Sequence, residues 1–496
     1  MPTNPTTKSQ VQAYRFVLRR MESALVRKDA MMLHEPMRNH LQAAAVGLIL
    51  GVLGLAAFFV VGLFKSTGDI EVGDIVAVEG TTSVFVAVET DDERLSLVPV
   101  FNVTSARLLV AALKPGAEPR ETKTVEESAL DGIPRLPQIG LRDAPQDLPA
   151  PEKLLDGAWS VCDNATVREE LPNAEFHPEL STTVIVGGER GRRLGADQAL
   201  LVEEDSDDGT YLLWTGQRLP VDLEDRAVRL AYELDGVVPR KVSTGLLNAI
   251  PQGSPLTPPD IRGAGDPAPF PQLSDAGVQI GEVVQVNRAG QESFFLVLPD
   301  GKQPVQRAVA DLIRFDHGTS LDFTEVTPED IREVPDAPES SRKNFSDFPG
   351  QVPQVLAITA APVACLVRPR ADADPVITVS TDEQLLLDKG VAVPGAAGDQ
   401  ADRVILAPGS GALVRGVLPD QRTDSGQLWL VTDQGFRYGV PSIEVARALR
   451  LGDKVALAPD SILKLLKEGP VLEPLDTLRL YSPELAQQEA ERRAGR

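Results

Sequence analysis

The chain has 496 residues, more than a single typical domain, so we expect two or more folded units. Its formal net charge of −23 excludes nucleic acid as the partner class, because binding of nucleic acid requires Lys and Arg to neutralise phosphates. Forty Pro and forty Gly beside an ordinary apolar fraction predict short elements and many turns around buried cores.

We expect residues 1–40 to form a cytosolic segment, which contains a basic amphipathic stretch. Five apolar residues recur at the helical period and predict one face of a helix: Tyr14, Val17, Leu18, Met21 and Leu25. Arg15 and Arg19 fall on another face. Such a helix suits two roles, contact with anionic lipid headgroups and docking against a cytoplasmic protein. The residues alone favour lipid, because a basic amphipathic helix beside a membrane span needs no further partner.

An uncharged apolar run follows, from Ala43 to Phe64, and predicts a single transmembrane helix over residues 41–65. As a helix the run would be about 33 Å long, enough for a hydrocarbon core. The alternative, a cleaved signal peptide, would carry a shorter apolar core nearer the N-terminus. Basic residues precede the run and favour a cytoplasmic N-terminus. Gly47 and Gly51 form a GxxxG pair that permits close packing of transmembrane helices.

Four later segments share a pattern of two strands joined by a polar turn and followed by a short helix. They cover residues 85–110, 211–230, 294–313 and 428–449. The first pairs with the third and the second with the fourth at an offset of roughly 210 residues, which predicts the duplication of an ancestral half. We therefore expect an α+β fold, with an elongated, pseudo-two-fold ectodomain built from a central β domain and four ββα-type repeat domains.

The parts are expected in the following order: a cytosolic segment (1–40), a transmembrane helix (41–65), repeat 1 (66–130), the first half of the central domain (155–192), repeat 2 (193–250), repeat 3 (275–320), the second half of the central domain (354–400), repeat 4 with a closing segment (401–475) and a charged tail (476–496). Pro-rich stretches at 133–151, 251–271 and 335–353 are interpreted as extended linkers.

The two cysteines, Cys162 and Cys365, occupy equivalent places in the two halves. The predicted orientation puts both on the extracytoplasmic side, where disulfides persist. Two interpretations are open, a disulfide that joins the halves and two buried free thiols, and compartment and symmetry favour the disulfide. In the chain-entropy model, closing so long a loop stabilises the fold by about 5 kcal/mol.

Motifs for catalysis are missing from the sequence. It contains no GxxxxGK[ST] phosphate loop and no GxSxG nucleophile turn. Its four histidines are not at metal-ligand spacing. We therefore expect no catalytic, cofactor-binding or metal-binding residues.

Several segments together resemble the EccB family, a membrane component of the actinobacterial type VII (ESX) secretion system. They read "KSQVQAYRFVLRRMESALVRKDAMMLHEPMR", "NVTSARLL", "WSVCD", "FRYGVP" and "EGPVL". The similarity runs from about residue 6 to about residue 475. It implies an inner (cytoplasmic) membrane protein with one span, a small cytosolic N-terminus and a periplasmic bulk. It also implies a central domain, four repeat domains and a core disulfide that matches Cys162 and Cys365.

The resemblance further implies partners, namely an EccC-type ATPase, EccD, EccE and additional copies of the same chain. In such a complex, docking of residues 14–30 on neighbouring cytosolic parts becomes at least as favoured as contact with membrane lipid. We expect a core structural subunit rather than an enzyme. Two alternatives stay open. One is a nucleotide hydrolase, because ATP hydrolysis has been attributed to the family, and the other is a cell-wall (peptidoglycan) binding module.

Overall fold

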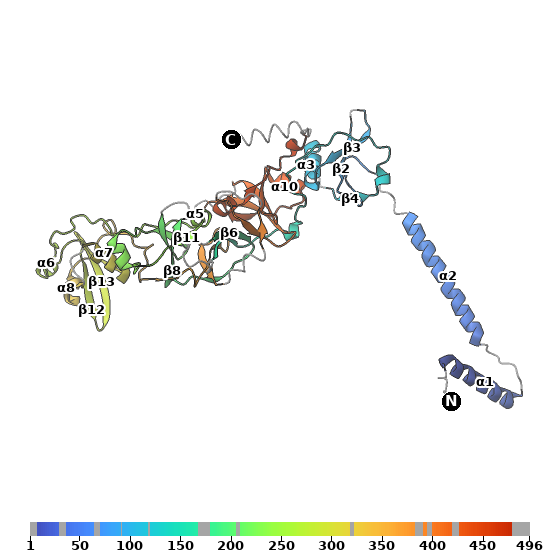
Figure 1. The fold of residues 1–496 in the computed structure, drawn as a ribbon, viewed down its shortest axis with the longest axis horizontal. Coiled ribbons are helices and arrows are strands. Elements are labelled where there is room, and N and C mark those ends of the chain that lie inside the picture. The colour runs from blue at the N-terminus through green and yellow to red at the C-terminus, as the bar shows by residue number, and fades with distance from the viewer. Residues whose placement is uncertain are drawn as a thin grey trace, which may run out of the picture. The chain divides into compact units, whose positions relative to one another are not determined.

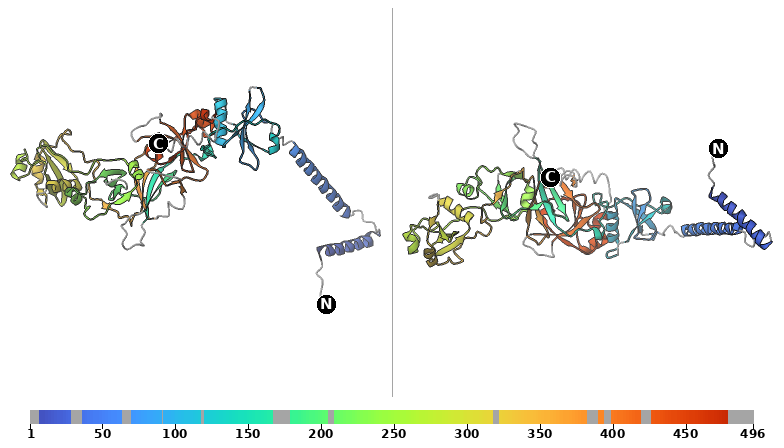
Figure 2. Two further views of the ribbon diagram at one scale, coloured as in Figure 1. Left: turned by 45° about the horizontal axis from the view of Figure 1, so that its top comes forward. Right: turned by 90° about the horizontal axis from the view of Figure 1, so that it is seen from below.

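The chain divides into two units, Met1–Ile70 and Glu71–Arg496, called unit one and unit two below. Figures 1 and 2 show a computed structural model of the chain. The structure describes residues 7–28, 36–63, 70–90, 92–117, 120–166, 179–204, 209–317, 322–381, 390–393, 399–418 and 426–478. Most of the predicted charged tail, from residue 479 onward, lies outside these ranges.

Unit one contains the helices α1 (Lys8–Arg27) and α2 (Pro36–Leu63). The backbone N–H of Thr7 donates to the Gln10 side chain across 2.9 Å and caps the start of α1. The helix ends at Lys28, which adopts a left-handed conformation with φ of 54°. In the part of the chain that the structure describes, no helix is apolar over enough length to cross a membrane.

Unit two contains four small sheets that share one strand order. In each sheet three consecutive strands form an antiparallel meander, a helix follows, and a further strand pairs in parallel with the first. The first two sets are β1 (Ile75–Val78), β2 (Val84–Glu89), β3 (Leu95–Val100), α3 (Val103–Leu113) and β4 (Thr122–Val125), then β8 (Gln198–Glu204), β9 (Thr210–Trp214), β10 (Gln217–Pro220), α4 (Arg226–Ala231) and β11 (Arg240–Val242).

The other two sets follow the same order. They are β12 (Val283–Arg288), β13 (Gln291–Leu298), β14 (Gly301–Val305), α7 (Arg307–His317) and β15 (Thr324–Glu325), then β21 (Gly411–Val417), β22 (Leu428–Thr432), β23 (Phe436–Val440), α10 (Ile443–Ala448) and β24 (Ala456–Pro459). Two short strands extend these sheets, β16 (Gln354–Val355) beside β8 and β25 (Lys467–Glu468) beside β23. The remaining short elements are η1 (Glu127–Leu130), η2 (Pro151–Lys153), α6 (Pro271–Asp275), α8 (Pro328–Glu333) and η3 (Pro474–Leu478).

Each repeat is therefore larger than the ββα unit predicted from the sequence, because a strand precedes the hairpin and another follows the helix. The closing strands contain only two to four residues, too few for an alternation of apolar and polar side chains to be visible. In repeat 3 the closing strand ends at Glu325, beyond the predicted boundary at residue 320.

A seven-stranded sheet in the order β19-β20-β6-β5-β17-β18-β7 combines strands from both halves of the chain. Figure 2 shows its teal and orange strands side by side. Its members are β5 (Trp159–Thr166), β6 (Glu179–Val186), β7 (Arg192–Arg193), β17 (Val363–Arg368), β18 (Val376–Ser380), β19 (Val391–Ala392) and β20 (Arg403–Ile405). Strand β20 falls beyond residue 400, where the sequence predicted repeat 4 to begin.

One face of this central sheet covers the largest hydrophobic core. Val161 of β5 and Leu366 of β17 point into it beside two short helices, α5 (Thr244–Ala249) and α11 (Asp460–Leu463). Leu246 and Ile462, one from each helix, are fully buried there. Two short helices from different halves of the chain thus pack on the same sheet.

The repeats of unit two pack in pairs through their helices. Helix α3 of repeat 1 contacts α10 of repeat 4, and α4 of repeat 2 contacts α7 of repeat 3 (Figure 1). The guanidinium of Arg107 on α3 donates to the carbonyl of Leu449, at the end of α10, across 2.7 Å. Under the predicted duplication, repeat 1 corresponds to repeat 3 and repeat 4 corresponds to repeat 2. The contact between repeats 1 and 4 is then equivalent to the contact between repeats 3 and 2.

The Pro-rich stretches are extended, but they pack as further edges of the repeat sheets. The amide of Leu97 donates to Pro134, and that of Lys302 donates to Pro335, each across 2.8 Å. In repeat 2 the amide of Arg218 donates to Pro251 across 2.8 Å. Proline lacks an N–H, so these segments pair at single residues instead of forming longer ladders.

Gly469 allows the segment after α11 to run against the third strand of repeat 4. Its amide donates to the carbonyl of Arg437 across 2.9 Å, and a Cβ at this position would overlap the ring of Tyr438. Gly469→Ala should lower the free energy of unfolding by about 1–3 kcal/mol, because the buried ring must shift. Guanidinium unfolding of the full chain in mild detergent measures the loss.

Gly188→Ala is the matched control for that substitution, because the nearest atom to its Cβ would be Arg190 Nη1 at 3.9 Å. An equal loss of stability in the two variants would contradict the steric explanation.

Candidate functional site

The predicted docking residues lie on α1 and are open to solvent. The apolar face of α1, defined as Tyr14, Val17, Leu18, Met21 and Leu25, is 47–82% exposed at each side chain. Exposed apolar side chains gathered on one helix face are typical of a surface that binds lipid or another protein. Ala30, the last residue of the predicted docking stretch, lies outside the described residues.

Gly47 and Gly51, the predicted packing pair, are one turn apart on α2. A Cβ built at either glycine would meet no heavy atom within 4 Å. The described part of this chain therefore places nothing against that face of the helix, and its role in helix packing stays a prediction.

Cys162 and Cys365 form a disulfide between the two central strands of the seven-stranded sheet. They are direct partners in the antiparallel register of β5 and β17. Their side chains are 0% and 2% exposed, respectively. Ile185, Val363 and Ile405 belong to the same apolar cluster, on the sheet face opposite the large core. The disulfide thus joins the two halves at the centre of the sheet, as compartment and symmetry predict.

A second buried group lies one residue along β5, and sequence reasoning missed it. The Asp163 carboxylate accepts hydrogen bonds from Thr182 Oγ1 at 2.8 Å, from the Ser243 amide at 2.7 Å and from Ser243 Oγ at 2.8 Å. Ser243 also caps α5, because its Oγ accepts from the amide of Leu246 at 3.0 Å. Asp163 therefore ties the central sheet to the last segment of repeat 2.

Arg240 of β11 supplies the opposite charge beside Asp163. Its guanidinium donates to the carbonyls of Ala361 and Pro362, which lead into β17. Burial lowers the pKa of Arg240 to about 10, while Asp163 acts in the opposite direction. Burial likewise raises the pKa of Asp163 above its ordinary value against the effect of its hydrogen bonds and of Arg240. Burial thus acts against the charged form of both groups, whereas the hydrogen bonds to Asp163 and the attraction between the two groups act in its favour.

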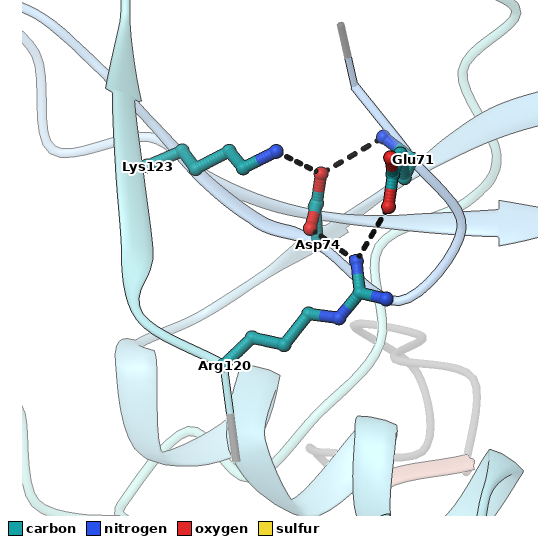
Figure 3. A network of polar contacts seen from close by, with 4 residues as sticks. All are labelled: Glu71, Asp74, Arg120 and Lys123. Carbon is teal, nitrogen blue, oxygen red and sulfur yellow. Dashed lines mark hydrogen bonds and ion pairs between the residues drawn. The ribbon is translucent and has the colours of Figure 1, made fainter. Parts of the chain in front are cut away.

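A third polar network lies at the start of unit two (Figure 3). The Asp74 side chain is 1% exposed and accepts from Lys123 Nζ at 2.6 Å, from Arg120 Nη1 at 2.7 Å and from the Glu71 amide at 2.8 Å. Arg120 also contacts the Glu71 carboxylate at 3.2 Å. Burial alone would raise the pKa of Asp74, but the bonds from Lys123, Glu71 and Arg120 outweigh it and lower the pKa. This network fixes the entry of the chain into repeat 1 against β4.

Asp74→Asn should lower the free energy of unfolding by about 1–3 kcal/mol at neutral pH, because hydrogen bonds to a charged acceptor are lost. The folded-state pKa of Asp74 is lowered, so its stabilisation exists above the unfolded-state pKa of about 3.9 and disappears as the pH falls through the folded-state pKa. Denaturant unfolding at about pH 7 and about pH 3 compares the stabilisation where it is complete with the stabilisation below the unfolded-state pKa, where it is diminished. Glu71→Gln is the control, since Glu71 is 69% exposed and its pairing contributes little. If the difference in unfolding free energy between the native chain and Asp74→Asn were as large at about pH 3 as at about pH 7, the stabilising role of the Asp74 carboxylate would be contradicted.

Neither polar network could be found from local sequence patterns. Asp74 and Lys123 are 49 positions apart, and Asp163 and Ser243 are 80 positions apart. The one available signal is the single acidic residue inside the otherwise uncharged strand segment around Cys162, where a charge requires a buried partner.

Two hollows of unit two lie where repeats approach each other. One of about 480 Å³ opens between α3 and α10 and is lined by Ala111, Pro115, Val445 and Leu475 among others. Another of about 550 Å³ lies beside repeats 2 and 3, with Trp214 in its wall. Within the described ranges, no group of three or more His, Cys, Asp or Glu could hold a metal ion.

Comparisons with known proteins agree on one family. The family described as "Type VII secretion system ESX-1, transport TM domain B" matches residues 3–481. A protein of Mycolicibacterium smegmatis named ESX-3 secretion system ATPase EccB3 is 33% identical, over 98% of this chain and 94% of its own length. The Mycobacterium tuberculosis protein of the same name is 32% identical, over 95% of this chain and 89% of its own length.

Solved structures show the same relationship. A chain of an intact ESX-5 inner membrane complex superimposes with a TM-score of 0.69 at 26% identity, over 97% of both chains. A chain of an EccB3 dimer from the ESX-3 core complex gives 0.67 at 30% identity, over 82% of this chain and 100% of that chain. Because the family match spans nearly the whole sequence, the chain belongs to the EccB family of type VII (ESX) secretion proteins.

Proposed function

We propose that the chain is a core structural subunit of a type VII secretion complex in the inner membrane. The observation that carries this proposal is the similarity over 97% of both chains to a subunit of an intact ESX-5 inner membrane complex. In this role α1 lies in the cytoplasm, one transmembrane helix crosses the membrane, and unit two lies in the periplasm and mediates assembly.

The membrane anchor is placed over residues 41–65. Its support is the uncharged apolar run from Ala43 within α2, together with the basic residues that precede it. The family description also contains the words "transport TM domain". Gly47 and Gly51 then offer a face on which another transmembrane helix can pack closely.

The periplasmic unit is proposed to be an elongated, pseudo-two-fold duplication. Three recurring features support this architecture: the shared strand order of the repeats, the pairing of α3 with α10 and of α4 with α7, and the antiparallel pair β5–β17. Two pairs of repeats joined through a shared central sheet suit a subunit that must contact several neighbours at once.

The proposed partners are an EccC-type ATPase, EccD, EccE, membrane lipid and further copies of this chain. Solved neighbours described as an inner membrane complex, as its periplasmic assembly and as an EccB3 dimer support partners of this kind. The apolar face of α1 would dock on cytosolic parts of these neighbours.

The test is purification of the tagged full-length chain from actinobacterial membranes in mild detergent, followed by identification of what co-elutes in the largest species. We expect an EccC-type ATPase together with EccD and EccE. A stable species that contains only this chain would contradict the proposal.

The docking role of α1 is tested in the same purification. Leu18→Ser with Met21→Ser should reduce partner co-elution more than tenfold, because each buried apolar side chain contributes about 1.5–3 kcal/mol and about 1.4 kcal/mol is tenfold. Arg15→Gln with Arg19→Gln, on another face of the same predicted docking helix, tests whether its basic residues contribute to partner co-elution. If partner co-elution were lost only in the arginine variant, contact of α1 with anionic lipid would be favoured instead.

The names of the relatives favour one alternative, an ATPase. The sequence contains no phosphate-loop motif. Purified full-length chain without partners would have to hydrolyse ATP at a rate that a single substitution in this chain abolishes. Activity that follows only the co-purified ATPase would assign hydrolysis to the partner.

A further inference from the structure

The two cysteines occupy the innermost place in the central sheet. Strand β5 lies between β6 and β17, and β17 lies between β5 and β18, so both strands are internal. Cys162 and Cys365 face each other in this pair and are 0% and 2% exposed. Neither sulfur is therefore reached from a sheet edge or from solvent once the sheet has formed.

Thiol–disulfide exchange cannot proceed in such surroundings. The reaction needs a thiolate and an open path to the sulfur under attack. The cysteines lie in an apolar cluster with Ile185, Val363 and Val367. Their partners on the flanking strands are the buried, uncharged Thr183 and Thr378. Surroundings from which water is excluded in this way do not hydrate a thiolate. A chain that folded with both thiols reduced would thus bury them in an unreactive form.

The central sheet contains strands from both halves of the chain, and this determines the point in folding at which the sulfurs become inaccessible. The cysteines are 203 positions apart, and repeats 2 and 3 lie between them in the sequence. Strand β20 of the second half pairs with β6 of the first, and β7 of the first half pairs with β18 of the second. The sheet is complete only after residues 159–405 have reached one compartment, so both thiols are accessible before that moment and hidden after it.

The relative rates decide how the bond can form. Small domains rich in β structure fold in roughly milliseconds to seconds. Uncatalysed formation and reshuffling of disulfides take seconds to hours. Closure of the sheet is therefore the faster process, and it would trap reduced thiols unless the oxidation is catalysed.

We infer that this protein is a client of an extracytoplasmic dithiol oxidase, a protein with a reactive Cys-X-X-Cys disulfide, and that the oxidase acts before the central sheet closes. The inference rests on the proposed function, because that topology places both cysteines in an oxidising compartment.

The step is a balanced exchange. The thiolate of one cysteine, either Cys162 or Cys365, attacks the disulfide of the oxidase, which forms a mixed disulfide and releases one oxidase thiolate. The thiolate of the second cysteine then attacks the sulfur of the first. The Cys162–Cys365 bond forms, the mixed disulfide breaks, and the oxidase leaves as a dithiol. Two electrons pass from the chain to the oxidase, and the protons of the two client thiols pass to the oxidase thiolates through solvent.

The experiment follows the full-length chain in actinobacterial cells with the oxidase gene expressed or repressed. Newly made chain is pulse-labelled, its thiols are frozen with acid, and free thiols are counted after unfolding by alkylation with a polyethylene glycol maleimide. With the oxidase present we expect no free thiols. Without it we expect at least about tenfold more chain with two free thiols. Cystine added during the pulse should restore the bond, whereas cystine added after folding should not, because the sulfurs are then buried.

Direct contact is tested with an oxidase whose second active-site cysteine is alanine. This variant should capture the chain as a mixed disulfide, and capture should disappear in the Cys162→Ala, Cys365→Ala double variant. Equal oxidation rates with and without the oxidase would overturn the inference and leave the proposed function intact. Two free thiols in both strains would overturn the proposed topology and, with it, the inference.

Discussion

Replacement of both Cys162 and Cys365 by alanine is expected to lower the free energy of unfolding by about 5 kcal/mol in the chain-entropy model. The bond closes a loop of 203 positions, and its removal lets the unfolded chain sample many more conformations. The measurement is guanidinium unfolding of the full chain in mild detergent. Trp159 is a suitable fluorescent probe, since it lies three positions from Cys162 on β5 and is 1% exposed.

The single variants distinguish the cross-link from local packing. Cys162→Ala and Cys365→Ala each abolish the bond, so each should cost nearly as much as the double variant, which is strong non-additivity. In the presence of reductant, the free energies of unfolding of the native chain and the double variant should become more similar. If the stability losses of the two single variants summed to the stability loss of the double variant, a cross-linking role would be contradicted.

Asp163→Ala is expected to lower the free energy of unfolding by about 3 kcal/mol or more, because three buried donors lose their acceptor at about 1–3 kcal/mol each. The substitution leaves two donors of Ser243 and one of Thr182 without their acceptor, and it leaves the buried guanidinium of Arg240 without its opposite charge. The same guanidinium unfolding measures the loss, and the separation of repeat 2 from the central sheet should be visible as increased hydrogen exchange in α5.

Two further variants test the cause of that loss. Asp163→Ala combined with Arg240→Met should recover much of the stability, because an apolar side chain removes the unpaired charge. Thr182→Val should cost only about 1 kcal/mol, the contribution of one ordinary hydrogen bond. A double variant no more stable than Asp163→Ala alone would show that the loss comes from packing and not from the charge.

Periodic and symmetric features of this molecule could be predicted from the sequence. The helical period of Tyr14 and Leu18 lies on α1, the polar turns fall between paired strands, and the equal placement of the two cysteines predicted their bond. These features depend on residues close together in the chain or on a pattern repeated along it.

The remaining features depend on contacts that leave no local pattern. The closing strands of the repeats are very short, and Asp74 and Asp163 acquire their partners only through tertiary folding. Proline suppresses a strand signal, so the sequence alone indicates linkers for the Pro-rich stretches, although each pairs with a neighbouring strand through isolated bridges.

The register of β5 and β17 has a consequence for the ancestry of the protein. Around the Cys162–Cys365 pair, residues at equal steps in opposite directions face each other, from Trp159 with Arg368 to Asn164 with Val363. An ancestor that consisted of one half would carry one such strand, which could pair with the same strand of a second molecule. Gene fusion then turns association between two molecules into a contact within one chain, at a high effective concentration that no longer depends on expression level. Under the predicted duplication, the bond at this position descends from a homodimer contact. The pairing of β7 with β18 and of β20 with β6 then resembles an exchange of strands between two molecules, which the fusion made permanent.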